Sequence, residues 1–173
     1  MKYDNNKKKQ SGSRKVLFFY RIDQLRVLIE DDIKMEVLSE SKIYPIPNAP
    51  AWYLGTSSVR GTILPVINIH YLLGMDIPAT RQRQWLLKLE HPLFSSIIIA
   101  IDSLPSQISL NTLSSFSANN NTYYPHWIES SALKNKNVFL FSDHYTLFEA
   151  LINNDQDKLI LSTLNYFQTK INK

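Results

Sequence analysis

The segment that most constrains the fold is residues 43–74, where three prolines precede an aromatic pair and an apolar run. Pro45, Pro47 and Pro50 fall within six residues. Each fixes φ near about −65° and lacks a backbone donor, and the residue before each is pushed toward extended conformations. This connector is therefore expected to be stiff and unable to pair as a central strand.

The apolar run at residues 62–69 is predicted to be a strand. It is apolar on both faces, which is typical of a central strand, whereas Pro65 favours an edge or a bulge. Arg60 stands at its entry, before Gly61, which can adopt a positive φ or allow close backbone approach. The following Tyr-Leu-Leu turn is expected to end at Gly74 in the left-handed region.

Other short segments have the composition of strands, and helix is expected mainly near the end of the chain. The polar stretch 111–137 reads as a long loop, Ser142 or Asp143 could cap a helix running through Ala150, and Asp155 begins a second helical stretch. Many short strands followed by helix indicate an all-β barrel or sandwich with a C-terminal helix. The remaining strands are expected at residues 16–21, 25–30, 34–38, 83–90, 95–101, 104–110 and 138–141.

The order of motifs in residues 43–74 resembles the CheW-like coupling domain of bacterial chemosensory systems. It comprises the proline-rich segment, the aromatic pair, glycine followed five and six residues later by Arg60-Gly61, the proline-containing strand and Leu-Leu-Gly. Weaker agreement extends over roughly residues 15–152, and the segments that carry it are Glu36-Val37, Ile101-Asp102-x-Leu104 and Ile108. Ser58 and Asn68 depart from the family, which usually has Asn and Asp at these positions.

This resemblance implies a fold of two five-stranded SH3-type β-barrel lobes packed on a shared apolar core, with the chain crossing between lobes more than once. A CheW-like domain is expected over residues 15–152, preceded by a disordered basic tail at 1–14. A C-terminal helix at 153–173 is expected to pack on the body, because its apolar residues recur at roughly helical spacing.

Charge is unevenly distributed along the chain. Residues 1–15 hold six basic groups against Asp4, a net of +5, and the rest has 13 basic and 14 acidic groups, a net of −1. Nucleic-acid binding by a basic face of the body is therefore not expected. A small nucleic-acid-binding barrel assisted by the basic tail stays open as the alternative, and salt-dependent retention of a chain lacking residues 1–15 on a polyanion resin would support it.

Motifs for catalysis, cofactors or metal are missing from the sequence. It has no cysteine, four widely spaced histidines and only four glycines, with no phosphate-loop motif. His70 and His144 are interpreted as surface or cap residues, and no enzyme activity or cofactor is expected. No apolar run approaches the roughly 20 residues of a membrane span, and no secretory signal is visible, so a cytoplasmic protein recruited to membrane-bound receptor arrays is expected.

The resemblance implies a non-catalytic adaptor that joins the helical-hairpin tip of a methyl-accepting chemoreceptor to the regulatory domain of a CheA-type histidine kinase. The wording around Trp52 looks closer to the pilus-linked, PilI-type branch, which controls twitching motility. Two interpretations of Arg60 stay open: it caps its own barrel, by bonding to carbonyls or to Glu36, or it contacts partners. The apolar members of the site are core by default, but some could be half exposed in the inter-lobe groove. Residues expected at partner contacts are Glu36, Val37, Arg60, Gly61, Val27, Ile101 and Leu104.

Overall fold

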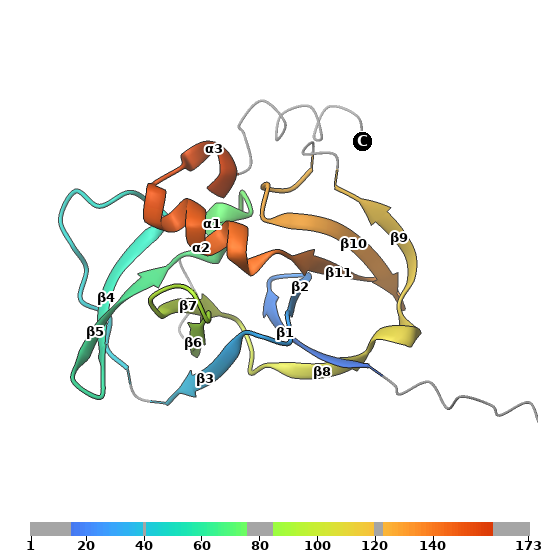
Figure 1. Cartoon of the computed structure of the whole chain (residues 1–173), viewed down its shortest axis with the longest axis horizontal. Helices are drawn as coiled ribbons and strands as arrows, with labels where there is room; N and C mark the ends of the chain where they lie inside the picture. The colour runs from blue at the N-terminus through green and yellow to red at the C-terminus, as the bar shows by residue number, and fades with distance from the viewer. Residues whose placement is uncertain (1–14, 40, 76–84, 120–122, 161–173) are drawn as a thin grey trace, which may run out of the picture.

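The computed structural model describes residues 15–39, 41–75, 85–119 and 123–160, which form two β-sheets and a group of short helices (Figure 1). The first sheet has the strand order β3-β6-β7-β5-β4 and the second has the order β8-β1-β2-β11-β10-β9. We call the first sheet the middle lobe, because its strands are consecutive in sequence, and the second the terminal lobe. The chain thus begins in the terminal lobe, builds the middle lobe and returns, which confirms the expected crossing between lobes.

The two lobes contain eleven strands within the described residues. Those of the middle lobe are β3 Lys34–Leu38, β4 Tyr53–Val59, β5 Thr62–Ile67, β6 Trp85–Glu90 and β7 Ile97–Ile101. Those of the terminal lobe are β1 Val16–Ile22, β2 Leu25–Ile29, β8 Ser106–Ser109, β9 Ser114–Ala118, β10 Ile128–Lys134 and β11 Asn137–Ser142. The helices are α1 Ile69–Leu72, the 3₁₀ turn η1 Leu110–Thr112, α2 His144–Asn153 and α3 Gln156–Leu159.

Both sheets curl so that their edge strands approach each other. In the terminal lobe the edges β8 and β9 are joined directly through η1. In the middle lobe the edges are β3 and β4, and Arg60 at the end of β4 reaches Glu36 of β3. The mostly-β, two-lobed architecture predicted from the sequence is confirmed, with one difference: the terminal lobe has six paired strands rather than five.

Strand β7 is covered on both of its faces. Alternate side chains of the strand point in opposite directions, and all five of its residues are buried because other residues pack against both faces. Ile98 and Ala100 lie inside the middle lobe, whereas Ile97, Ile99 and Ile101 belong to a larger cluster shared with the terminal lobe. We call that cluster the shared seam; it includes Tyr20, Val27, Leu87, Trp127, Leu140 and Phe148. A third cluster, around Leu17, Leu28 and Phe139, fills the terminal lobe.

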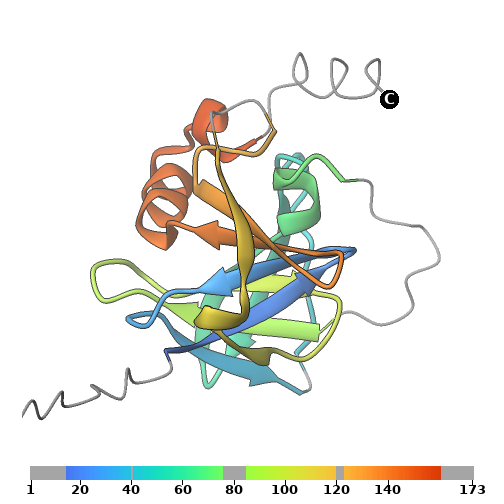
Figure 2. The same cartoon turned by 90° about the vertical axis from the view of Figure 1, so that its right-hand side faces the viewer.

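The helices close the seam at one end of the molecule (Figures 1 and 2). The Asp143 carboxylate caps α2 by accepting from the Thr146 amide at 3.0 Å, as the sequence predicted for Ser142 or Asp143. The buried face of α2 carries Leu147 and Phe148. Beyond it, α3 is anchored where the Trp127 indole donates to the Leu159 carbonyl at 3.1 Å. The expected tail at 1–14 and the rest of the expected terminal helix, 161–173, lie outside the described residues.

The proline connector runs along the edge of the middle lobe and pairs with β4 only at one bridge, Tyr44 with Thr56. The two residues exchange backbone hydrogen bonds of 2.8 and 2.9 Å. A Cβ on Gly55 would lie 2.2 Å from the Tyr44 carbonyl oxygen, so this close approach requires glycine. The connector is therefore seated on β4 by a contact between backbones.

Strand β5 is central, as its two apolar faces predicted, and lies between β7 and β4. Pro65 is tolerated because the pairing with β7 begins one residue later, at Val66, so that only β4 flanks the proline. Gly74 follows α1 with φ 70°, which confirms the expected left-handed stop.

The expectation of a long loop over 111–137 is wrong. Two strands, β9 and β10, form within it, and β10 pairs with both β9 and β11. Polar residues are acceptable in β9 because it is an edge strand whose Ser114, Phe116 and Ser117 side chains are exposed. A two-residue turn at Asn135 and Lys136, with φ of 50° and 65°, joins β10 to β11.

Candidate functional site

The tip of the β4–β5 hairpin presents an arginine on a tight turn. Arg60 and Gly61 have φ of 51° and 83°, and positive values at both central residues match the twist of a two-residue hairpin. The Arg60 side chain is 77% exposed, and its Nη2 donates to Glu36 Oε1 at 2.5 Å. The interpretation that Arg60 bonds to Glu36 is thus confirmed, and most of the Arg60 side chain is exposed to solvent.

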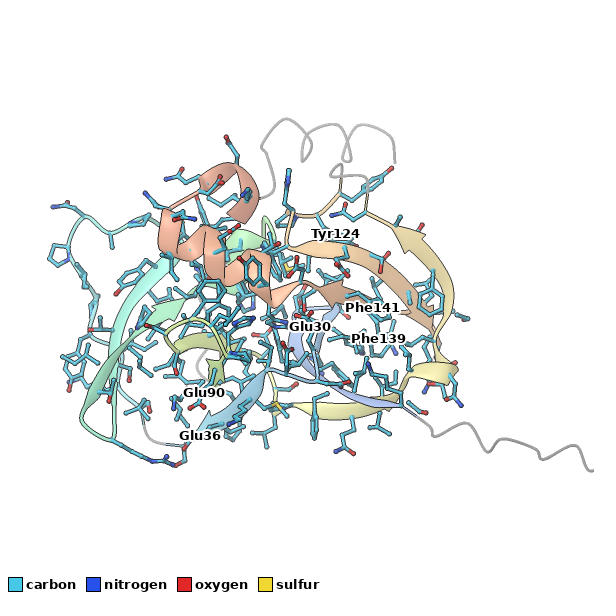
Figure 3. All side chains as sticks on the ribbon, viewed as in Figure 1. Glu30, Glu36, Glu90, Tyr124, Phe139 and Phe141 are labelled. Carbon is cyan, nitrogen blue, oxygen red and sulfur yellow. The ribbon has the colours of Figure 1, made fainter. Side chains whose placement is uncertain are left out.

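Charges of both signs surround this pair. Lys88 lies opposite Glu36 in the β3–β6 register and its ammonium is 3.9 Å from Glu36 Oε2. Lys88 also bonds to Glu90, and this hydrogen bond and the ammonium charge lower the pKa of Glu90. We call Arg60, Gly61, Glu36, Lys88 and Glu90 the Arg60 corner; Figure 3 shows Glu36 and Glu90 beside each other on its β3–β6 side.

A second surface feature is a groove between the two lobes. Its walls come from β1 and the end of β2 on one side and from β3 on the other. Val16 and Phe18 are 47% and 39% exposed there, so its surface is partly apolar. We call it the inter-lobe groove, and its lining residues are Val16, Phe18, Ile29, Glu30, Asp31, Ile33, Lys34 and Met35.

The structure separates the residues that the sequence grouped as partner contacts. Glu36, Arg60 and Gly61 come together at the Arg60 corner. Val37 is 38% exposed, next to Glu36 but on the opposite face of β3, and Leu104 is 48% exposed beyond the end of β7.

Val27 and Ile101 were also expected at partner contacts, but both are 0% exposed and belong to the shared seam. Neither can touch a partner in this structure, and their role here is packing. Both side chains point into the shared seam, whereas the groove is lined by other residues, such as Phe18 and Met35. Alternation in the sequence identifies the two faces of a strand but not which of them another lobe covers.

Two buried histidines were misread as surface or cap residues. His70 is 1% exposed, and its Nε2 lies 3.0 Å from Asp102 Oδ1. Asp102 Oδ2 in turn accepts from the Asp23 amide in the β1–β2 turn at 2.5 Å. This chain of contacts links α1, which lies between β5 and β6 of the middle lobe, to the terminal lobe.

His144 is 0% exposed at the start of α2. Glu30 Oε2 accepts from the His144 amide at 2.7 Å and lies 2.9 Å from its Nδ1. Burial raises the pKa of Glu30, but the hydrogen bonds and charge of His144 outweigh it and leave that pKa below its usual value. The partners are 114 residues apart, so no local signal in the sequence could have revealed this contact.

Within the described residues, no three or more His, Asp or Glu side chains are grouped to hold a metal ion. Nor does any helix there have the length and apolar character to cross a membrane. The described surface presents an exposed charged corner and an open, partly apolar groove.

These features define a two-lobed β protein that offers open surfaces for contact. A family model described as CheW-like domain matches residues 20–150, well over half of the 173 residues. The chain belongs to the CheW-like domain family, as its sequence predicted.

Relatives and solved structures agree with this assignment. The chain is 31% identical over 65 residues to Protein PilI of Pseudomonas aeruginosa, covering 37% of this chain and 36% of that protein. It is 28% identical over 60 residues to Protein FrzA of Myxococcus xanthus, covering 35% and 38%. The aligned part thus spans little more than a third of either relative. The scaffolding protein TtCheW of Thermoanaerobacter tengcongensis superposes with a TM-score of 0.59 at 18% identity, over 75% of this chain and 88% of that one, and shares the fold.

Proposed function

We propose that this protein is a non-catalytic adaptor that couples a methyl-accepting chemoreceptor to a CheA-type histidine kinase in the cytoplasm. Its role is to hold two partners in a fixed geometry, and the phosphoryl chemistry belongs to the kinase. Membership of the CheW-like family supports this proposal, and the inter-lobe groove is the observation that carries it.

The groove has the chemistry that an amphipathic helix needs. Such a helix lays its apolar face on an apolar floor and its polar flanks against a charged rim. Val16, Phe18 and Met35 supply apolar surface, while Glu30 and Lys34 supply charge of both signs. The helical hairpin at the receptor tip is therefore the partner we assign to this groove.

The Arg60 corner supplies contact groups on the middle lobe. An arginine fixed by one carboxylate keeps further donors in a planar fork that can bind a second carboxylate or a carbonyl. We assign it, with the half-exposed Val37 and Leu104, to partner contacts at the receptor and kinase interfaces. Engaging two partners at once makes the second contact intramolecular, so weak interfaces can build an ordered array.

The output of the pathway is proposed from the relatives. Similarity to Protein PilI supports control of type IV pili and twitching motility, rather than of flagella. A deletion strain tests this: loss of twitching with normal swimming is the expected result, whereas the reverse pattern would assign the protein to a flagellar pathway.

Reconstitution from purified parts tests the adaptor function. The full chain is mixed with a receptor fragment containing the helical-hairpin tip and with the kinase regulatory domain, and the ternary complex is captured through the receptor. Phe18→Asp places a charge in the groove and should abolish receptor capture. Phe116→Asp, at an exposed phenylalanine of β9 in the terminal lobe, is the matched control and should leave capture unchanged.

Arg60→Glu tests the corner in the same assay. It should lower recovery of the receptor fragment, of the kinase regulatory domain or of both, while the melting temperature stays close to that of the wild type. Lys136→Glu, a charge reversal in the exposed β10–β11 turn, is its control. If no variant and no wild-type chain joins receptor to kinase, the adaptor function is wrong.

A further inference from the structure

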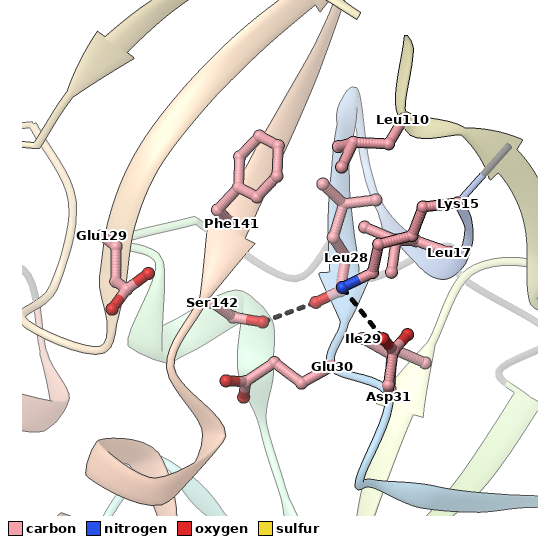
Figure 4. Close-up of a pocket in the computed structure, with 10 residues that line it drawn as sticks. All are labelled: Lys15, Leu17, Leu28, Ile29, Glu30, Asp31, Leu110, Glu129, Phe141 and Ser142. Atoms are coloured by element: carbon pink, nitrogen blue, oxygen red, sulfur yellow. Dashed lines mark hydrogen bonds and ion pairs between the residues drawn. The ribbon is translucent and has the colours of Figure 1, made fainter. Parts of the chain in front are cut away.

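A pocket with an apolar floor opens where strands β2 and β11 part (Figure 4). Their pairing ends with Leu28 opposite Phe141, and the Ser142 hydroxyl donates to the Leu28 carbonyl at 2.5 Å. Beyond this point the segment after β2 turns toward β3, and the segment after β11 enters α2. Leu17, Leu28, Leu110 and Phe141 line the apolar part of the pocket.

Three carboxylates and one ammonium group stand around this floor. Asp31 is 63% exposed, and its Oδ2 lies 2.9 Å from the Lys15 ammonium. Glu30 is 45% exposed on its side chain and uses Oε2 to hold His144. The three carboxylates outnumber the single ammonium group that lines the pocket, which favours a further cation.

Glu129 supplies the third carboxylate from the opposite wall (Figure 4). It lies at the β-bulge where the β10–β11 register shifts between Ile128 and Ser130. A bulge re-aims the side chain at that position. Glu129 is exposed, so its charge is available to a ligand.

The chain itself carries a group of complementary charge next to this pocket. Lys15 lines the pocket and is the point where residues 1–14, which lie outside the described residues, join the body. Those residues contain five basic side chains against the single acidic Asp4, and their largest group is Lys7-Lys8-Lys9. We call residues 1–14 the N-terminal arm.

The composition of the arm allows its lysines to return to the pocket. Gln10-Ser11-Gly12-Ser13 separates the lysine group from Arg14 and has the composition of a flexible linker. A linker of this composition that covers the six residue steps from Lys9 to Lys15 has an average end-to-end distance of roughly 13 Å, long enough for the lysine group to reach the pocket beside Lys15. A tether this short holds the effective concentration of the lysine group near the pocket in the millimolar range. Even weak charge pairing is therefore enough for docking.

We propose that the Lys7-Lys8-Lys9 group of the N-terminal arm docks on this pocket, which we call the arm pocket, by pairing with Glu30, Asp31 and Glu129 over the apolar floor. Ile29, Glu30 and Asp31 line both the arm pocket and the inter-lobe groove. A docked arm therefore competes with whatever enters the groove, and this second step rests on the proposed function. Neutralising the arm should tighten receptor binding.

Docking is tested on the full chain by paramagnetic broadening. The chain has no cysteine, so Asn5→Cys provides a single thiol for a spin label. With the wild-type charges, amide signals of Leu110, Glu129 and Phe141 should be broadened several-fold more than in the same labelled chain carrying Lys7→Gln, Lys8→Gln and Lys9→Gln. The tether is identical in both chains, so the difference measures docking alone.

Glu129→Gln and salt sharpen the result. Glu129→Gln should reduce the excess broadening, and Asp157→Asn, at an exposed carboxylate of α3, should not. At roughly 1 M salt, where the screening length is about 3 Å, the excess should vanish. The proposal is wrong if the excess broadening is unchanged both by Glu129→Gln and by roughly 1 M salt. In a second experiment, an isotope-labelled chain that carries no spin label is mixed with a spin-labelled chain that carries no isotope label. Broadening of the signals of the first chain also overturns the proposal, because the pocket then binds the arm of another copy.

Competition is measured separately, as the affinity of the receptor hairpin fragment. The triple lysine variant should bind it several-fold more tightly than the wild type, and equal affinities would remove the competition step. If the fragment binds neither chain, the proposed function fails, while the broadening experiment still decides whether the arm docks.

Discussion

The Arg60–Glu36 contact and the Glu30–His144 contact are built from similar groups and stand in opposite surroundings. In both, a carboxylate meets a basic side chain from another element. Arg60 is 77% exposed in its pair, whereas His144 is 0% exposed in the other. Exposed pairs contribute little to stability, because water and salt screen them and two long side chains must be ordered. The exposed Arg60–Glu36 contact therefore adds little to stability, whereas the buried His144 contact ties the end of β2 to the start of α2.

Truncation of a seam side chain should give the largest difference between these regions. Ile99 is 0% exposed in β7, and Ile99→Ala should lower the free energy of unfolding by about 2–5 kcal/mol, because a buried cavity remains. Ile63 lies near the Arg60 corner and is 71% exposed, so Ile63→Ala should change it by less than about 0.5 kcal/mol. Urea denaturation of both variants gives the comparison, and equal losses would contradict it.

Gly55, which contacts the proline connector, and Gly61, at the Arg60 corner, should differ in their tolerance of a side chain. Gly55→Ala forces a Cβ against the Tyr44 carbonyl at a positive φ of 136°, and should cost about 2–4 kcal/mol through overpacking and backbone strain together. Gly61 has φ +83° with no atom near its Cβ position. Gly61→Ala should therefore cost only about 1–2 kcal/mol, the backbone strain alone. Thermal unfolding of the two variants measures the difference, and a larger loss for Gly61→Ala would show that the connector is loosely held.

The buried histidine contact should make stability depend on pH. Glu30→Ala leaves the His144 amide without its acceptor and should cost about 1–3 kcal/mol at pH 7. Hydrogen bonds from His144 hold the pKa of Glu30 below its usual value. The stabilisation from its ionised form is therefore complete above the unfolded pKa, near about 4.3, and is lost as pH falls through the folded pKa.

Urea titrations of wild type and Glu30→Ala at several pH values test this dependence, and the gap between their stabilities should close as the pH falls through the folded pKa of Glu30. Glu129→Ala, which removes an exposed carboxylate of the terminal lobe, should change stability little at any pH. A constant gap between wild type and Glu30→Ala at all pH values would mean that the ionised carboxylate contributes nothing.

The smallest expected effect on stability is at Arg60. Because its side chain is mostly exposed, Arg60→Ala should cost no more than about 1 kcal/mol and shift the melting temperature only slightly. The same variant should weaken partner capture strongly if the corner is a contact surface. A fall of several degrees in melting temperature would instead make Arg60 chiefly structural.

Local patterns in the sequence predicted much of the middle lobe and the hairpin-tip residues of the Arg60 corner. Prolines, glycines and the alternation around residues 62–69 act through backbone geometry over a few residues, so they can be read directly. Arg60 and Gly61 were identified in this way, but carbonyl groups and Glu36 both stayed open as the partners of Arg60. The structure selects Glu36 by folding β3 against the hairpin tip.

The rest depended on contacts between distant segments. β10 is half polar and became a strand because β9 and β11 flank it. The local signal that was overlooked is Asn135, a residue type that tolerates the positive φ of a tight turn. His70 and His144 were misread because their carboxylate partners are 32 and 114 residues away. Val27 and Ile101 were placed at partner contacts because a sequence cannot tell a surface covered by a second lobe from one open to a partner.

The strand order sets a sequence of events for a chain leaving the ribosome. Residues 34–101 encode the middle lobe without interruption, so all its strands are present once about that point has been synthesised. β1 and β2 are made first yet must wait for β11, whose parallel pairing with β2 joins Leu28 to Phe141. Such long-range pairing is slow to form. The nascent hairpin of β1 and β2 therefore lacks its β11 neighbour until residue 142 has been synthesised, and until then β2 presents an unpaired edge to which another chain could add.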